Sequence, residues 1–265
     1  MTAPRVVPPN PHALAVRLRA AGCVYAEDEA ALLVETAADD AQLEALVSRR
    51  VAGEPLEHLL GWAAFGGLRV AVGPGVFVPR PRTEVLVDVA LERLPPGPSV
   101  VVDLCCGSGA IGLVLATRRS AIELHATDVD PVAVACARVN LAGVQGAAYE
   151  GDLWAALPAT LRGRADLVAA NVPYVPSVEL AAMPAEAREH EPRAALDGGA
   201  DGLDVLRRVV AEAPAWLAPG GCLLTETSRA QADPAAAIVE AAGLTPEIVA
   251  KLDVRVVVGR ARVEG

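Results

Sequence analysis

Aromatic residues are scarce in this chain of 265 residues, of which they make up 3%, whereas hydrophobic residues of all kinds make up 53%. The core must therefore be built from small aliphatic side chains. Charged residues account for 21% of the chain, and this composition fits a packed globular protein and excludes extended disorder. A chain of this length can hold one large domain, or one core domain with a small appendage.

Basic charge is also scarce. The 23 Lys and Arg residues are outnumbered by 33 Asp and Glu residues, the formal net charge is −10, and the sequence shows no dense Lys/Arg stripe. Because nucleic-acid-binding surfaces concentrate positive charge, the composition argues against nucleic acid as a partner.

The signals of several other classes of protein are missing. No apolar run approaches the roughly 20 residues that span a bilayer, and the N-terminal MTAPRVVPPNPH has no apolar core of a signal peptide. Neither the five cysteines nor the four histidines have metal-binding spacing. We therefore expect a cytoplasmic protein with reduced cysteines, no metal site and no membrane association.

The first third of the chain indicates a helical domain and a linker. Apolar residues recur at helical spacing between residues 11 and 61, punctuated by Gly22, Gly53 and Pro55, which predicts three or four short helices in a domain spanning residues 1–63. In residues 65–81, two alternating runs flank Gly73-Pro74-Gly75, so we expect a hairpin linker over residues 64–82.

From residue 83 to 265, apolar strands alternate with helices, which predicts an α/β, Rossmann-like domain with a largely parallel sheet covered on both faces. A long loop with one helical turn is expected over residues 177–202. The expected strands are Val100–Leu104, Ile122–Thr127, Ala147–Tyr149, Ala165–Ala170, Cys222–Thr227 and two more within Pro246–Gly259.

The stretch VVDLCCGSGAIG (Val101–Gly112) indicates a strand, a glycine turn and a helix start, which bares backbone amides to a ligand. Asp128 ends the next strand, where an acid can bind a ribose diol. Nicotinamide dinucleotides and S-adenosylmethionine both use this arrangement. Asp103 beside a pyrophosphate would be unfavourable, whereas S-adenosylmethionine carries no phosphate, so the charge favours S-adenosylmethionine over a nicotinamide cofactor. The two acids at the ends of consecutive strands argue against a structural glycine turn without a ligand.

A third acid, Asp152, follows the third expected strand and could contact the adenine, although an N-cap role would explain it equally well. The predicted cofactor-binding residues are Asp103, Cys105, Cys106, Gly107, Ser108, Gly109, Asp128, Asp152, Leu153 and Asn171.

The fourth strand ends in NVPYVP (Asn171–Pro176), and here the chain resembles amino-methyltransferases whose fourth strand ends in N-P-P-Y. Within that group it is similar to the protein-(glutamine-N(5)) methyltransferases that modify peptide release factors. The resemblance covers most of the chain from about residue 45 onward. It includes GEPLEHLLG (Gly53–Gly61), FGGLRV (Phe65–Val70), PGVFVPRPRTE (Pro74–Glu84), DLCCGSGAIG, EPRAALDGGADGLD (Glu191–Asp204) and LAPGG (Leu217–Gly221).

The resemblance implies a seven-stranded sheet whose last strand is antiparallel, and S-adenosylmethionine as cofactor. The implied reaction is methylation of a glutamine amide in the GGQ loop of a class-1 release factor. The enzyme would be a monomer whose helical domain docks the substrate. It implies a catalytic set of Asn171, Val172, Pro173 and Tyr174. The side-chain oxygen of Asn171 and the carbonyl of Val172 would accept the two N–H bonds of the planar nitrogen, and so direct its lone pair at the sulfonium methyl group. Pro173 would stiffen the turn, and Tyr174 would pack against the planar group.

Some residues depart from the family pattern. Val172 stands where the family usually has proline, Arg82 where it has glutamate, and Cys105 where it has a loop glycine. These departures indicate a divergent branch. An adenine-specific nucleic-acid methyltransferase, an enzyme for another planar nitrogen and a non-catalytic cofactor-binding module therefore remain as alternatives.

Overall fold

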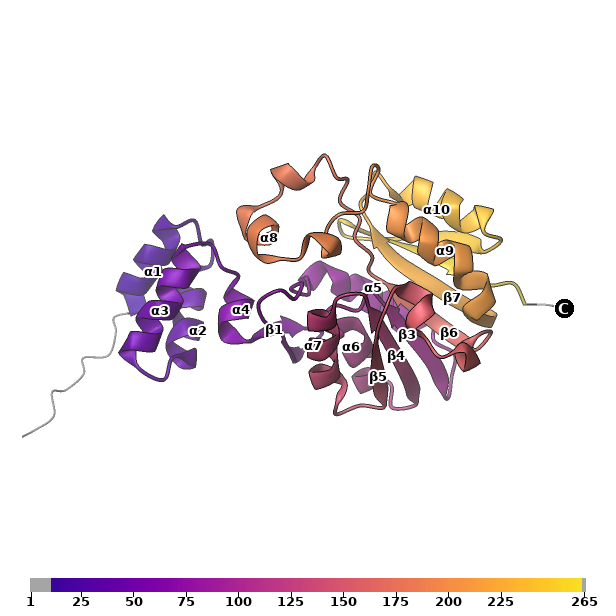
Figure 1. Ribbon diagram of the computed structural model, residues 1–265, viewed down its shortest axis with the longest axis horizontal. Coiled ribbons are helices and arrows are strands. Elements are labelled where there is room, and N and C mark those ends of the chain that lie inside the picture. Colours follow the sequence, from indigo (N-terminus) through magenta and orange to yellow (C-terminus); the bar gives the residue numbers. More distant parts are fainter. Residues whose placement is uncertain (1–10, 264–265) are drawn as a thin grey trace, which may run out of the picture.

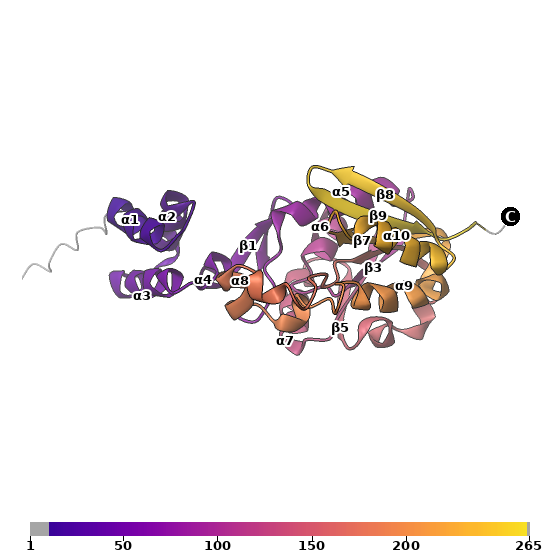
Figure 2. The same cartoon turned by 90° about the horizontal axis from the view of Figure 1, so that it is seen from above.

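The computed structural model describes residues 11–263, which fold into a small helical part at one end and an α/β part built on a seven-stranded sheet (Figure 1). The helical part comprises α1 (Pro11–Ala20), α2 (Ala26–Thr36), α3 (Asp40–Val51) and α4 (Leu56–Leu60). It encloses a core of its own around Leu18, Leu33 and Val47, all buried. Both views place α1–α3 apart from the sheet (Figure 2).

A two-stranded hairpin joins this part to the sheet, but its turn is not where the sequence predicted it. Strands β1 (Trp62–Phe65) and β2 (Leu68–Ala71) pair around Gly66-Gly67, whereas residues 73–75 lie beyond the hairpin. The two turn glycines have φ of 59° and 81°. A two-residue turn that matches strand twist needs positive φ at both positions, which favours Gly-Gly over Gly-Pro-Gly.

The hairpin packs on the α/β part. Phe65 and Val70 belong to the core on one face of the large sheet. The Asn140 side chain accepts a hydrogen bond from Ala71 N (2.8 Å) and donates to the carbonyls of Ala71 (2.9 Å) and Ser108 (2.8 Å). The predicted linker thus contacts the glycine loop.

The large sheet has the order β5-β4-β3-β6-β7-β9-β8. Strands β3 to β7 are parallel and β9 is antiparallel to both its neighbours, as the resemblance implied. The chain runs outward from β3 to β5 and then returns to β6 on the other side of β3, so the sheet reverses its order there, where such sheets bind ligands. The strands are β3 (Ser99–Leu104), β4 (Ile122–Asp128), β5 (Gly146–Glu150), β6 (Ala165–Ala170), β7 (Leu217–Thr227), β8 (Thr245–Lys251) and β9 (Val254–Arg260).

Helices cover both faces of this sheet, and successive β3 residues show why. Val101 packs into one core with α5 (Glu84–Arg93), α6 (Ala110–Arg118) and α7 (Pro131–Leu141). Val100 and Val102 pack into the other with α9 (Asp204–Trp216) and α10 (Ala232–Ala241). A strand buried on both faces is expected to be largely apolar, as this one is over Val100–Val102.

Residues 177–202, here called the strap, connect β6 to α9. The predicted long loop contains the helix α8 (Ala185–His190) and the 3₁₀ turns η4 (Leu180–Ala182) and η5 (Arg193–Ala195). Further 3₁₀ turns are η1 (Pro81–Thr83), η2 (Leu153–Ala156) and η3 (Ala159–Leu161). The strap contacts the helical part through Arg50 of α3, which pairs with Glu29 of α2 at 2.7 Å and with Glu186 of α8 at 3.2 Å.

Candidate active site

One cavity collects most of the predicted site residues at the carboxyl ends of β3, β4 and β6. Its walls also include the segment before α5, among them Phe77 and Arg82, and the strap, among them Met183 and Leu196. The predicted residues that line it are Cys105, Cys106, Gly107, Ser108, Asp128, Asp152, Leu153, Asn171, Val172, Pro173 and Tyr174.

The glycine loop is held against β4. Cys106 N donates to the carbonyl of Thr127 at 3.0 Å, and Gly107 N donates to Asp128 Oδ2 at 2.8 Å. Gly107 has a φ of 54° and Gly109 one of 75°, which glycine adopts without steric cost. Cys105 adopts a φ of 55° in the same loop, so the residue that replaces the family's glycine keeps glycine's conformation.

Asp128 presents its carboxylate to the cavity from the end of β4. Besides Gly107, its Oδ1 accepts a hydrogen bond from Asp130 N at 3.0 Å. Burial raises the pKa of this carboxyl, while the backbone donors oppose that shift. A carboxylate oxygen can accept two hydrogen bonds, so the site retains the capacity to bind a diol.

Asp152 does not act as a side-chain N-cap of η2, because its carboxylate makes no capping hydrogen bond. Instead it pairs with Arg208 of α9 at 2.5 Å, and both side chains are 56% exposed. Leu153 follows with a φ of 50° and lines the cavity beside it. The pair places a partly exposed carboxylate at the cavity's edge.

Two predicted cofactor contacts lie outside the cavity wall. Asp103 is fully buried beneath the glycine loop, where its Oδ2 accepts a hydrogen bond from Gly112 N at 2.9 Å and its Oδ1 has no partner among the described residues. Burial raises the pKa of Asp103 to about 7, and nearby Asp128 adds to the rise. Gly109 precedes α6, where a Cβ atom would lie 3.2 Å from that of Ala137. Both residues shape the loop from behind.

Asn171 to Tyr174 leave the end of β6 and enter the cavity wall. Asn171 Oδ1 is buried and accepts no hydrogen bond from residues 11–263. The Tyr174 hydroxyl donates to Glu226 Oε1 at 3.0 Å and accepts from Arg82 Nη2 at 2.8 Å. Burial and the Glu226 carboxylate raise the pKa of Tyr174 to about 12, which keeps the phenol protonated.

The sequence analysis missed several polar residues around this site. Glu226 lies near the end of β7 and its side chain is 3% exposed; an acid at the end of a central strand was a usable signal. Gln231, just before α10, and Arg208 carried no such signal. Arg80, in the cavity wall, pairs with Glu191 of the strap at 2.6 Å.

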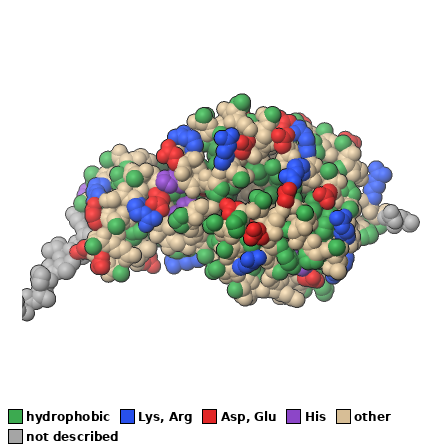
Figure 3. Space-filling model, in the orientation of Figure 1, with side chains coloured by type: hydrophobic (Ala, Val, Ile, Leu, Met, Phe, Trp, Pro, Cys, Tyr) green, Lys and Arg blue, Asp and Glu red, His purple; other side chains and the backbone are tan. Residues whose placement is uncertain are grey.

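Within residues 11–263, no helix is both long and apolar enough to cross a bilayer, and no group of three or more His, Cys, Asp or Glu residues could hold a metal ion. On the face in Figure 3, Lys and Arg are dispersed among acidic side chains rather than gathered in a stripe.

The sheet order, the glycine loop after β3 and the Asn-x-Pro-Tyr turn after β6 define a Rossmann-like methyltransferase. A methyltransferase small domain matches residues 68–189. Two solved structures share the fold: a ribosomal protein L11 methylase from Lactobacillus delbrueckii subsp. bulgaricus (TM-score 0.54, 16% identity, 74% of this chain and 86% of that one) and a methyltransferase from Pyrococcus furiosus (TM-score 0.56, 16% identity, 74% and 90%).

Curated relatives show the family within this class. The chain is similar to release factor glutamine methyltransferases from three organisms. The protein from Mycolicibacterium smegmatis is 44% identical over 182 residues and matches 68% of this chain. Those from Streptomyces coelicolor (42% over 195 residues) and Deinococcus radiodurans (40% over 205 residues) match 72% and 76% of it. The chain belongs to the release factor glutamine methyltransferase family. The match spans 64% of the length of the M. smegmatis protein and 69% and 72% of the other two.

Proposed function

We propose that this protein transfers a methyl group from S-adenosylmethionine to the side-chain amide nitrogen of a glutamine, the acceptor being the GGQ loop of a class-1 peptide release factor. The observation that carries the proposal is the buried Asn171 Oδ1, which has no hydrogen-bond partner among the described residues and lies in the wall of a cavity that also contains Asp128. Buried polar groups are rarely left unpaired, so an oxygen of this kind in a cavity wall is a candidate for contact with a ligand. The names of the relatives support the same substrate.

The residues on the cofactor side fit S-adenosylmethionine. Asp128 can accept hydrogen bonds from the two ribose hydroxyls, and the backbone can approach the cofactor closely at Gly107, which has no side chain. Asp152 and Leu153 would flank the adenine. When bound, the cofactor supplies an electrophilic methyl group on a positively charged sulfur.

The residues on the acceptor side address the poor nucleophilicity of an amide, whose nitrogen lone pair is delocalised into its carbonyl. Asn171 Oδ1 and the Val172 carbonyl would accept the two N–H bonds of the amide. This orients the nitrogen and stabilises the positive charge that develops on it. Tyr174, held through its hydroxyl by Arg82 and Glu226, would pack against the amide plane.

The test is transfer of labelled methyl from S-adenosylmethionine to a class-1 release factor, to its GGQ glutamine-to-alanine variant and to duplex DNA. We expect label on the release factor only. Asn171→Ala should reduce the rate about 100-fold or more, the range found when one polarising group is removed from an active site. Gln145→Ala, which removes an exposed carboxamide outside the cavity, is the control and should leave the rate unchanged.

Label that persists on the glutamine-to-alanine variant would overturn the glutamine assignment. Label on DNA alone would support an adenine methyltransferase instead.

A further inference from the structure

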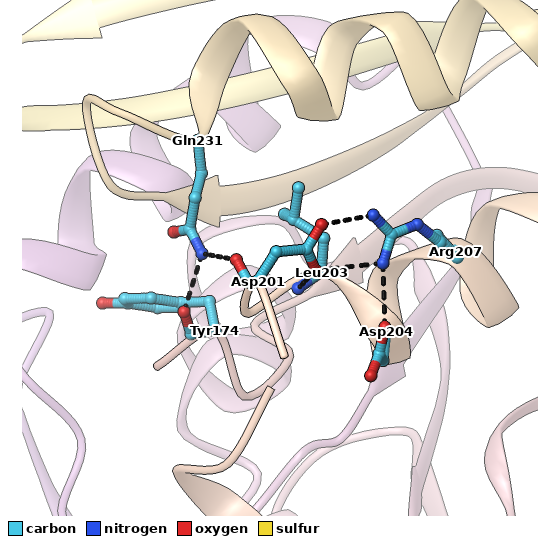
Figure 4. A network of polar contacts seen from close by, with 6 residues as sticks. All are labelled: Tyr174, Asp201, Leu203, Asp204, Arg207 and Gln231. Carbon is cyan, nitrogen blue, oxygen red and sulfur yellow. Dashed lines mark hydrogen bonds and ion pairs between the residues drawn. The ribbon is translucent and has the colours of Figure 1, made fainter. Parts of the chain in front are cut away.

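Gln231 joins two segments of the site that are far apart in sequence. The residue lies just before α10 and is 8% exposed. Its Nε2 donates to the carbonyl of Tyr174 at 2.8 Å and to that of Asp201 at 3.0 Å (Figure 4). Its Oε1 accepts from Ser228 Oγ at 2.8 Å. Both N–H donors of the carboxamide are thus used on two backbone carbonyls, one in the NVPY turn and one at the end of the strap.

The contact leaves no room for a side chain at position 202. Gly202 has a φ of 77°, and a Cβ atom there would lie 2.3 Å from both Gln231 Nε2 and the Tyr174 carbonyl oxygen. Asp201 is fixed in turn, because its carboxylate binds Arg207 at 2.5 Å and accepts from Leu203 N at 3.1 Å (Figure 4). Three chain segments therefore meet at one side chain.

This contact bears on the reaction because the NVPY turn lacks one of the prolines usual at this place. Proline would preset φ at position 172, whereas Val172 leaves it free. The fixed φ of Pro173 removes one of the torsions between the Val172 carbonyl, which would accept the substrate N–H, and the Tyr174 carbonyl. Holding the Tyr174 carbonyl therefore limits where the Val172 carbonyl can lie.

We infer that Gln231 is a positioning residue for methyl transfer: it fixes the turn that carries the acceptor oxygens and couples that turn to the strap. The inference rests on the proposed function. Gln231 is absent from the cavity wall and the glycine loop is held separately by Asp128. The two hydrogen bonds of Gln231 Nε2 to the carbonyls of Tyr174 and Asp201 are here called the clamp. Loss of the clamp should therefore lower turnover without weakening cofactor binding.

The kinetic test compares Gln231→Ala and Gln231→Glu with the control Gln145→Glu, which makes the same change at an exposed glutamine. All are assayed with S-adenosylmethionine and release factor at a temperature where circular dichroism shows them folded. We expect kcat to fall about tenfold to 100-fold in both Gln231 variants, the cost of a displacement of about 1 Å. The Kd of S-adenosylmethionine, measured by calorimetry, should stay within about twofold of wild type, as an intact cofactor site requires.

A second measurement is independent of the substrate. Hydrogen exchange should become faster in Gln231→Ala at residues 174–177 and 198–204 and stay unchanged at residues 104–112. Adding Val172→Pro to Gln231→Ala should restore part of the lost kcat, because proline presets the torsion that the clamp otherwise limits.

The outcomes separate the two proposals. If the wild-type protein labels no release factor, the proposed function fails, while hydrogen exchange still tests the clamp. Unchanged exchange in Gln231→Ala, an unchanged kcat, or a loss of cofactor affinity in step with kcat would each overturn the role of Gln231.

Discussion

At the scale of single residues, the charge of Asp103 is governed by burial. The pKa of this carboxyl is raised from 3.8 to about 7, so between these values the folded state holds a proton that the unfolded state has lost. The stability contributed by that proton is present in full below about pH 4 and is lost as the pH rises through 7.

We therefore expect Asp103→Asn, which mimics the neutral form, to flatten this part of the pH dependence. Relative to wild type, its free energy of unfolding should rise between pH 5 and pH 8, by on the order of 2–4 kcal/mol at most. Urea denaturation at both pH values measures the difference, with Asp253→Asn as the exposed control. Parallel curves for the two proteins would show that Asp103 is already ionised at pH 5.

Arg82 gives a second prediction at this scale. Its Nε lies 3.2 Å from Glu226 Oε1, and the Glu226 side chain is almost completely buried. Although glutamate is usual at this position in the family, Arg82→Glu would place a second carboxylate beside a buried one and remove the donor to Tyr174. Because Arg82 is more than half exposed, we expect a modest loss of stability, about 1–2 kcal/mol, with a larger loss of kcat.

The measurement is denaturation together with the methylation assay, and Arg82→Lys should retain most of both properties because it keeps the charge. Arg118→Glu breaks an exposed pair with Asp88 at 3.2 Å and is the matched control. Equal effects of the two glutamate substitutions would mean that Arg82 is merely a surface charge.

At the scale of elements, the strap is fastened to the cavity wall at Glu191. This carboxylate is 1% exposed; it accepts from Arg80 Nη2 at 2.6 Å and from Val78 N at 3.2 Å. The ends of the strap are held separately, at Ser177 and at Asp201. The middle of the strap is therefore held by this buried contact and, at α8, by the pair of Arg50 and Glu186.

Glu191→Gln should loosen the strap locally, since a charged hydrogen bond of this kind contributes about 1.5–3 kcal/mol. Trypsin can cleave at Arg188 and Arg193, which flank the contact, and we expect cleavage there to become several-fold faster. Glu179→Gln changes an exposed glutamate of the strap away from both cleavage sites and should leave the cleavage rate as in wild type. An unchanged rate in Glu191→Gln would locate the restraint elsewhere.

The hairpin shows where prediction of an element fell short. Gly73-Pro74-Gly75 was interpreted as the turn because Pro and Gly punctuate chains, whereas the actual turn is Gly66-Gly67. What selects it is a tertiary fit as well as local chemistry: a Cβ atom on Gly66 would lie 2.6 Å from the Val114 side chain of α6. Periodicity within the linker carried no information about α6.

At the scale of the whole molecule, local signals predicted the sheet and the part of the cavity wall at the ends of β3, β4 and β6. Strand ends followed by Asp128 and Asn171, and the glycines between them, were visible in the sequence because each motif is contiguous. The contacts that hold the wall were not. Glu226 and Gln231 reach Tyr174 across 52 and 57 residues, and nothing adjacent to them in the sequence marks that approach.

Asp103 illustrates the complementary limit. Its position near the end of a strand was predicted. Successive side chains of a strand point to opposite faces, so a shift of one position along the strand decides whether a side chain faces the cavity or the space behind the loop. The sequence predicted the strand, and the packing of Gly112 against Asp103 decided the direction.

Arg50 has a consequence that reaches beyond stability. One guanidinium, 10% exposed, contacts α2 through Glu29, the carbonyl of Glu54 and α8 of the strap through Glu186. The helical part is thus connected through one side chain to the strap, which lines the cavity. A substrate protein that bound the helical part and the strap at the same time would keep its acceptor loop near the cavity. The effective concentration of that loop would be on the order of millimolar. The choice of substrate protein would then be made by the surfaces of the helical part and the strap, far from the reacting nitrogen. The active site itself would need to recognise little more than a planar amide.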